Sequence, residues 1–291
     1  MTPLSDRDDE NIRKLLLECG QEALVLSAKA FEVFEKGVND YVTSVDRRLD
    51  TRLSTAFEQW FSQDGVITEE NQASKQLFKQ NYDRLWLIDP IDGTDDFIGG
   101  KAHYSVMVGL LEQGRPRAGW VYAPAREQMV WGGAGWGLFH QVQGSPARLN
   151  PQPPPALEVA CPIMIGDKDR RRYGEALCQV IQQQHPPLAT TVQFLSLGSF
   201  GLKVIEVIKG QAGLYLYLNG RVKLWDTTGP IALAQAAGLT CCDLEGQPLQ
   251  FEGEAIDIAT LTHQQAIIVG WPDYVDRLLP AIQQAVNQVL P

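Results

Sequence analysis

The stretch WLIDPIDGTDDF, residues 86–97, restricts the fold of this chain more than any other. Residues 86–88 form an apolar run typical of a buried strand, and the proline and glycine that follow turn the chain out of the sheet. Asp89 and Asp92 are therefore expected at the carboxyl edge of a central strand. Two carboxylates three residues apart on a tight turn can bind hard cations, and the free amides after Gly93 can bind an anion. A solvated acidic turn is the alternative, but surface turns seldom follow so apolar a strand.

The composition excludes several classes of protein. With 44% hydrophobic residues the chain can bury a sizeable core, and its net charge of -10 argues against a nucleic acid polymer as partner. Divalent metals could still supply the positive charge for a small phosphate ester. No apolar run reaches the roughly 18 residues of a membrane span, and residues 1–10 are unlike a signal peptide, which predicts a cytoplasmic protein without a membrane partner. The cysteines lack zinc or disulfide spacing, and Cys241 and Cys242 are expected in a buried strand.

The first half of the chain, residues 1–150, is predicted to pack helices on an antiparallel sheet. The helical spacing of apolar residues predicts a long first helix and then a second helix. A first helix that is broken near Gly20 is the alternative. Four strand-like runs separated by turn residues are typical of an antiparallel meander. The helices are expected at residues 8–35 and 46–61, a short strand at 66–68, and the meander at 105–111, 117–122, 128–132 and 137–141.

The proline-rich residues 151–155 predict a stiff, extended connector and a boundary. In the second unit, residues 156–291, strands alternate with helices, which indicates an α/β arrangement. The strands are expected at 157–160, 191–195, 213–218, 239–243 and 266–270, and the helices at 167–184, 198–209, 227–237 and 273–289.

Four acidic residues outside the turn have a structural explanation as well as a functional one. Asp46 lies near a predicted helix start and Asp226 stands before another, where a carboxylate caps the helix. A capping carboxylate is held in orientation by backbone amides, so Asp226 would be a well-aimed third metal ligand if its helix faced the first-half turn. Glu69 and Glu70 follow a short strand onto a turn, where adjacent acids are usually solvated.

Three acidic motifs together resemble those of the inositol monophosphatase-like family of metal-dependent phosphatases. They are the DPIDGT turn at residues 89–94, the Glu69-Glu70 pair before it and Trp225-Asp226 after it. The likeness covers nearly the whole length, and the three motifs in the family's order are more specific than any one alone. It implies a layered α-β-α-β-α sandwich with an antiparallel sheet in the first half and a mixed, more parallel sheet in the second.

The resemblance also implies which residues hold two or three Mg²⁺ ions. Glu69, Asp89 and the main-chain carbonyl of Ile91 would hold one ion. Asp89, Asp92 and Asp226 would hold a second. All these ligands are oxygen atoms, which suits Mg²⁺ better than zinc.

By the same resemblance, Thr94, hydrogen-bonded to Asp46, and Glu69 would orient the attacking water, with Glu70 as a supporting acid. The amides of Gly93 and Thr94 would bind phosphate oxygens. The family further implies inhibition by lithium and a homodimer. The half from residue 156 onwards would carry the last metal ligand and the residues that choose the substrate.

Several second-half features look like the 3'(2'),5'-bisphosphate nucleotidase branch, whose substrate is adenosine 3',5'-bisphosphate. In that branch a serine and a lysine at one helix start contact the nucleotide, which points to Ser199 and Lys203. Asp226 is also expected to contact the substrate. The serine stands four residues before the lysine rather than three, a spacing that also fits inositol phosphatases. Asn219 stands where those enzymes carry a glutamate, which weakens the inositol interpretation. A solvated helix lysine is the alternative for Lys203.

The expected function is therefore hydrolysis of a small phosphate ester, adenosine 3',5'-bisphosphate to AMP and phosphate, by a metal-activated water. Inositol 1-phosphate and fructose 1,6-bisphosphate are the alternative substrates. The three-residue spacing of Asp89 and Asp92 disfavours an aspartyl-phosphate mechanism, which uses an Asp-x-Asp turn. A hypothesis from another class is a binding or regulatory protein that kept the fold and lost catalysis. Against it, every acidic position that the mechanism needs is present.

Overall fold

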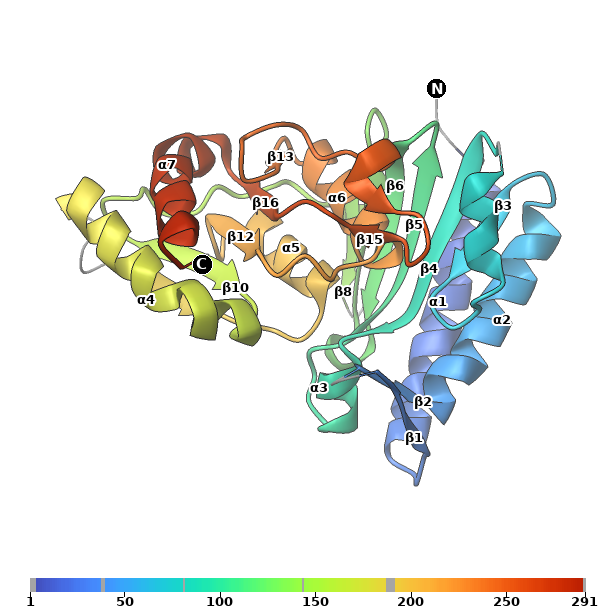
Figure 1. Ribbon diagram of the computed structural model, residues 1–291. Coiled ribbons are helices and arrows are strands. Elements are labelled where there is room, and N and C mark those ends of the chain that lie inside the picture. Colours follow the sequence, from blue (N-terminus) through green and yellow to red (C-terminus); the bar gives the residue numbers. More distant parts are fainter. Residues whose placement is uncertain (1–3, 38–39, 81, 143, 187–191, 290–291) are drawn as a thin grey trace.

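The computed structural model describes residues 4–37, 40–80, 82–142, 144–186 and 192–289. Helices and sheets alternate in five layers (Figure 1). In order, these are α1 (Asp6–Ser27) with α2 (Ser44–Trp60), a large sheet, α5 (Phe200–Ile208) with α6 (Leu224–Ala236), a smaller sheet, and α4 (Asp167–Gln184) with α7 (Pro272–Val289). The expected α-β-α-β-α sandwich is confirmed.

The large sheet has seven strands in the order β3-β4-β5-β6-β7-β8-β9. Its neighbours pair antiparallel, as the meander predicted, except that β3 runs parallel to β4. A separate hairpin of β1 (Val33–Gly37) and β2 (Asp40–Thr43) precedes α2. The strands of the large sheet are β3 (Gly65–Thr68), β4 (Arg84–Asp92), β5 (Ser105–Glu112), β6 (Arg115–Ala123), β7 (Gln128–Gly133), β8 (Gly137–Val142) and β9 (Ala147–Arg148).

The smaller sheet is mixed and has the order β11-β10-β12-β16-β13. Strand β10 pairs parallel with β11 and β12, whereas β16 pairs antiparallel with β12 and β13. Cys241 and Cys242 lie in β13 as free thiols. The strands are β10 (Cys161–Ile165), β11 (Val192–Leu195), β12 (Leu214–Tyr217), β13 (Thr240–Cys242) and β16 (Ile267–Gly270), and a two-stranded sheet joins β14 (Ile256–Asp257) to β15 (Thr262–His263).

Two predicted elements differ from the structure. The first helix ends at Ser27, and residues 33–37 form β1. Helix α1 also runs unbroken through Gly20. Glycine stands there because a Cβ would lie 2.3 Å from the ring of Tyr122 on β6. The strand predicted at 157–160 begins later, at Cys161. Residue 191, the predicted start of β11, lies outside the described residues.

One hydrophobic core joins the two halves of the chain. It contains Leu87 and Val121 of the large sheet together with residues of α5, α6 and the smaller sheet. Helix α6 lies directly on the large sheet, since a Cβ on Gly119 would stand 2.2 Å from the carbonyl oxygen of Gly229. This close approach brings the start of α6 to the end of β4. The predicted division at residues 151–155, which carry neither helix nor strand, stays a prediction.

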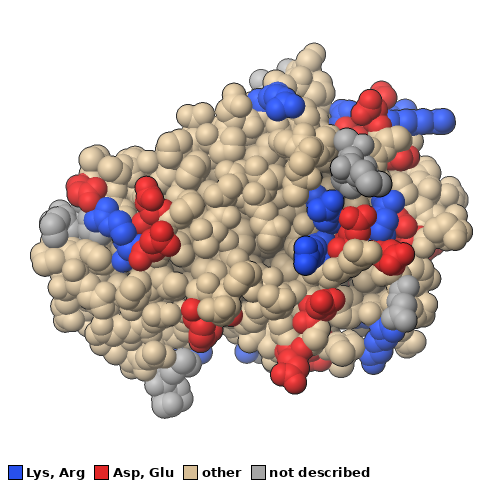
Figure 2. Space-filling model, turned by 90° about the horizontal axis from the view of Figure 1, so that it is seen from above, with Lys and Arg blue, Asp and Glu red and all other residues tan. Residues whose placement is uncertain are grey.

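The acidic motifs lie at one end of the large sheet. Figure 2 shows the end away from the short helix α3 (Thr94–Ile98), where basic and acidic side chains are mixed in groups between stretches of uncharged surface. The opposite end, where β4 runs into α3, carries the acidic motifs (Figure 1). Among the described helices, none is long and apolar enough to cross a membrane.

Candidate active site

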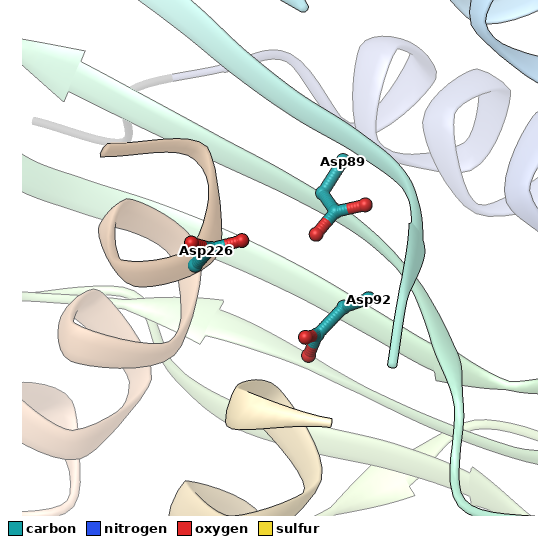
Figure 3. Close-up of side chains that lie close together, drawn as sticks. All are labelled: Asp89, Asp92 and Asp226. Atoms are coloured by element: carbon teal, nitrogen blue, oxygen red, sulfur yellow. The ribbon is translucent and has the colours of Figure 1, made fainter. Parts of the chain in front are cut away.

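Three carboxylates from distant parts of the chain meet where β4 ends. Figure 3 shows Asp89 and Asp92 of β4 and Asp226 of α6 pointing into one space. One oxygen atom of each lies within 4.8 Å of the others. Three ionised carboxylates this close repel one another, so the folded protein needs protons or a cation between them.

The turn that presents these carboxylates is fixed by local geometry. The pairing of β4 with β5 shifts between Asp89 and Asp92, and the Ile91 amide donates to Asp89 Oδ1 at 2.9 Å. Gly93 then adopts a φ of 91°, which is left-handed. A Cβ at Gly93 would also lie 2.9 Å from the carbonyl oxygen of His103, so glycine is required for space as well as conformation.

Asp226 and Asp46 occupy equivalent positions in their helices. Each is the third residue of its helix, not the residue before the helix as the sequence suggested for Asp226, because α6 begins at Leu224. Asp226 accepts a hydrogen bond from the Lys223 amide at 2.7 Å, and Asp46 accepts one from the Thr43 amide at 2.9 Å. Backbone amides therefore fix both carboxylates in orientation.

Thr94 connects the turn to Asp46. Its hydroxyl lies 3.3 Å from Asp46 Oδ1 and 3.0 Å from the Ile91 carbonyl oxygen. A hydroxyl has one hydrogen to donate, so either contact leaves an oxygen lone pair of Thr94 available as an acceptor. Asp46 itself is fully buried, and burial raises its pKa to about 6.

Glu69 and Glu70 follow β3 and share a partner that the sequence did not indicate. Lys36 of β1 places its Nζ 2.7 Å from Glu69 Oε1 and 2.8 Å from Glu70 Oε1. Burial, and then the Glu69 charge, raises the pKa of Glu70 to about 7. No local pattern marks Lys36, because the contact depends on how the β1–β2 hairpin lies over the end of β3.

The clustered carboxylates favour protonation or a cation. Burial, and then repulsion from Asp92 and Glu69, raises the pKa of Asp226 to about 8. The pKa of Asp89 is raised well above its ordinary value by the same burial and by its acidic neighbours. The donor set consists of carboxylate oxygens, and it fits a hard divalent cation such as Mg²⁺.

Ser199 holds Asp92 in place. It caps α5, is fully buried, and donates its hydroxyl hydrogen to Asp92 Oδ2, which also accepts from the Gly201 amide at 2.9 Å. The Leu202 amide and the Ser105 hydroxyl then reach the Ser199 oxygen, at 3.0 and 2.9 Å. The assignment of Ser199 to the substrate stays a prediction, whereas its contact with Asp92 is a feature of the fold.

Lys203 is buried, so the alternative of a solvated helix lysine is wrong. Only 5% of the residue is exposed, its Nζ donates to the Gly198 carbonyl at 3.1 Å, and it lies 5.3 Å from the centre of the Tyr215 ring. Burial lowers its pKa, and the charge of Asp92 is the largest effect opposing this shift.

Two cavities meet at Glu69. The first, of about 840 Å³, is lined by Gly93, Thr94, Lys203 and Asn219. The second, of about 640 Å³, borders Glu69 and Asp226. Both volumes lie in the range of small-molecule sites, which are about 300–1,000 Å³. Substrate-sized space therefore adjoins the carboxylate cluster.

Replacing Thr94 by valine is expected to lower kcat for phosphate release roughly 100-fold, the scale of one lost proton-transfer group. Valine has the shape of threonine but neither donates to Asp46 nor accepts from a water. Thr94→Ser, which keeps the hydroxyl, is the matched control and should retain more than a tenth of wild-type kcat. Steady-state phosphate release checks both variants; equal activity of the valine and serine variants would contradict a role for the hydroxyl.

The model of the inositol monophosphatase family matches residues 9–284. This chain belongs to the inositol monophosphatase family. The 3'(2'),5'-bisphosphate nucleotidase CysQ of Escherichia coli K12 is 31% identical over 229 residues, 77% of this chain and 84% of the relative. The Nus factor SuhB of Haemophilus influenzae is 28% identical over 225 residues, 73% of this chain and 75% of the relative.

A solved structure shows the same fold. An IMPase/NADP phosphatase complexed with Mg²⁺ and phosphate superposes with a TM-score of 0.75 at 19% identity, over 94% of each chain. Inositol monophosphatase family proteins are Mg²⁺-dependent phosphatases, which agrees with a cluster of oxygen ligands beside a substrate-sized cavity.

Proposed function

We propose that this member of the inositol monophosphatase family is a 3'(2'),5'-bisphosphate nucleotidase, which converts adenosine 3',5'-bisphosphate to AMP and phosphate. The observation that carries the proposal is the meeting of Asp89, Asp92 and Asp226 beside a substrate-sized cavity lined by both cationic and acidic side chains. Two of the cations that line this cavity, Lys168 and Arg221, have no carboxylate oxygen within 4.0 Å among the described residues. Cations without a close carboxylate partner suit a substrate with more than one phosphate.

Mg²⁺ bound by Glu69, Asp89, Asp92, Asp226 and the Ile91 carbonyl would lower the pKa of the attacking water and neutralise charge on the leaving oxygen. The protein's own groups place the reactants. Thr94, which contacts Asp46, has a lone pair free to accept a hydrogen bond from that water.

The phosphate that is removed would lie against the turn. The amides of Gly93 and Thr94, two residues that line the first cavity, would bind its oxygens. The supporting acid Glu70 keeps Lys36 close to Glu69. Lys203 contributes its charge beside Asp92, and Ser199 fixes the Asp92 carboxylate. Inhibition by millimolar lithium, a homodimer and a cytoplasmic location belong to the same proposal.

A substrate panel tests the proposal directly. Phosphate release with Mg²⁺ is measured on adenosine 3',5'-bisphosphate, inositol 1-phosphate and fructose 1,6-bisphosphate. The nucleotide is expected to have a kcat/KM about 100-fold above the others, which is roughly 2.7 kcal/mol of transition-state discrimination. A higher kcat/KM for either of the other two would replace the nucleotidase proposal by an inositol or sugar phosphatase. Release of no phosphate from any of the three would favour a non-catalytic module.

A further inference from the structure

The second cavity holds two lysines, Lys75 and Lys223, whose ammonium groups have no role in the chemistry of the proposed function. It borders Glu69 and Asp226 but does not include the Gly93 turn or Lys203. Its walls come from the 3₁₀ helix η1 (Ser74–Lys79), the start of α6 and the loop before β15. The cations that line it are Lys36, Lys75, Lys168, Arg221 and Lys223, against the acids Asp40, Glu69 and Asp226.

Lys75 and Lys223 are held in this cavity by neutral partners. Lys75 donates to Gln72 Oε1 at 2.9 Å, and its Nζ lies 4.7 Å from the centre of the Trp225 ring. Lys223 donates to the Thr262 hydroxyl. In the part of the chain that the structure describes, neither ammonium has a carboxylate oxygen within 4.0 Å, whereas Lys36 in the same cavity has two.

The two ammonium groups have hydrogen-bond donors to spare for an anion. Lys75 and Lys223 are both only partly exposed, and burial, followed by the charge of Lys223, lowers the pKa of Lys75. Each ammonium has three N–H donors and uses one on a neutral oxygen in the contacts above, so donors remain on both. The Thr260 hydroxyl, which also lines the cavity, lies 2.7 Å from that of Thr262. The Thr260 hydroxyl donates its hydrogen to Asp257 Oδ2 at 2.9 Å, so the Thr262 hydroxyl donates to Thr260 and the free donors are those of the two ammonium groups. Two ammonium groups with free donors suit a phosphate group.

We infer that Lys75 and Lys223 form a second anion subsite, which binds the phosphate of the substrate that is not removed. This inference rests on the proposed function, because it requires a substrate with two phosphates. The subsite borders Glu69 and Asp226, so one ligand can reach the metal carboxylates and both lysines.

Lys203 is less suited to this phosphate. It is almost fully buried, and the carboxylates of Asp92, Asp96, Asp167 and Asp169 all act on its charge. Lys203 is therefore enclosed by the protein beside these carboxylates, whereas Lys75 and Lys223 are partly exposed in the second cavity.

Binding of AMP tests the subsite without catalysis, since AMP keeps the 5'-phosphate and lacks the phosphate that is removed. Isothermal titration calorimetry in EDTA compares the wild type with Lys75→Gln and Lys223→Gln. Each substitution is expected to raise the Kd for AMP about tenfold and to leave the weaker binding of adenosine unchanged. The matched control is Lys79→Gln on the same 3₁₀ helix, because Lys79 is exposed and does not line the cavity. An unchanged Kd for AMP in both cavity variants would overturn the subsite.

A kinetic comparison of substrates with and without the 5'-phosphate tests whether the subsite binds that phosphate. With adenosine 3',5'-bisphosphate, both cavity variants are expected to raise KM about tenfold and change kcat less than twofold. With adenosine 3'-monophosphate, both constants should stay at the wild-type values. Equal losses on the two substrates would overturn the inference. The inference would also be overturned if inorganic phosphate bound to the wild type more tightly than to the two lysine variants while AMP did not bind. If the wild type releases no phosphate from either nucleotide, the proposed function fails, and AMP binding still decides the subsite.

Discussion

Replacing Asp92 by asparagine is expected to lower kcat/KM for phosphate release at least about 1,000-fold, or roughly 4 kcal/mol, in a protein that remains folded. Asparagine keeps one side-chain oxygen, which can still accept the hydrogen bonds of Ser199 and the Gly201 amide. Its other side-chain atom becomes an NH₂ group, which cannot bind a cation. The substitution therefore removes a metal ligand and preserves the contacts that attach α5 to the turn.

Phosphate release and circular dichroism together check this expectation. Asp276→Asn, an exposed carboxylate on α7, is the matched control and should keep wild-type activity and stability. Retention of more than a tenth of wild-type activity by Asp92→Asn would rule out Asp92 as an essential ligand. Loss of the folded spectrum would show instead that the charge of Asp92 is needed by the fold.

In the absence of metal, the free energy of unfolding is expected to fall as the pH rises from 7.0 to about 8.2. In the unfolded chain Asp226 titrates near its ordinary value of 3.8, whereas in the folded protein its pKa is about 8. Below pH 3.8 both states hold the proton, so the group has no effect. Between these two pKa values the folded state binds more protons than the unfolded state, and stability falls with pH. Above pH 8 both states are ionised and the full loss remains.

Mg²⁺ is expected to reverse this loss, because it binds the ionised carboxylates of the folded state. At 100 times its Kd, one such ion would add about 2.7 kcal/mol to the free energy of unfolding. Urea unfolding with EDTA or Mg²⁺ at the two pH values measures both effects. The buried His263, whose pKa burial lowers to about 4, does not interfere, because an unfolded histidine is also largely neutral above pH 7.

The matched control for the metal effect is Asp226→Asn. It should flatten the pH dependence and reduce the gain from Mg²⁺, because it removes one of the three clustered carboxylates. A metal-free wild type whose stability is constant or rises over this range would contradict the repulsion between Asp89, Asp92 and Asp226. A gain from Mg²⁺ that is equal in wild type and variant would place the ion elsewhere.

The local features of the site could be predicted from the sequence because they depend on neighbouring residues. The apolar run with the proline and glycine after it placed Asp89 and Asp92 together near the carboxyl end of a central strand, as the structure has them. The chain was expected to leave the sheet at Pro90, and this was wrong, because β4 continues with an irregularity to Asp92, which still pairs with Ser105. The alternation of strands and helices after residue 156 likewise indicated an α/β arrangement. Element ends were less predictable. The first helix was drawn too long because Phe31 and Phe34 continue its apolar spacing, although the chain has left the helix after Ser27.

The sequence by itself thus determined the acidic cluster at the end of a strand, the alternation of strands and helices after residue 156 and the family to which the chain belongs. The tertiary structure alone decided which side chains meet across long separations. Lys36 reaches Glu69, and Ser199 reaches Asp92 over 107 residues. The same packing buried Lys203 and, among the described residues, left Lys75 and Lys223 without a carboxylate oxygen within 4.0 Å. The reason is physical: the contacts arise where α5, α6 and the β1–β2 hairpin meet the end of the large sheet, and no spacing along the chain encodes that meeting.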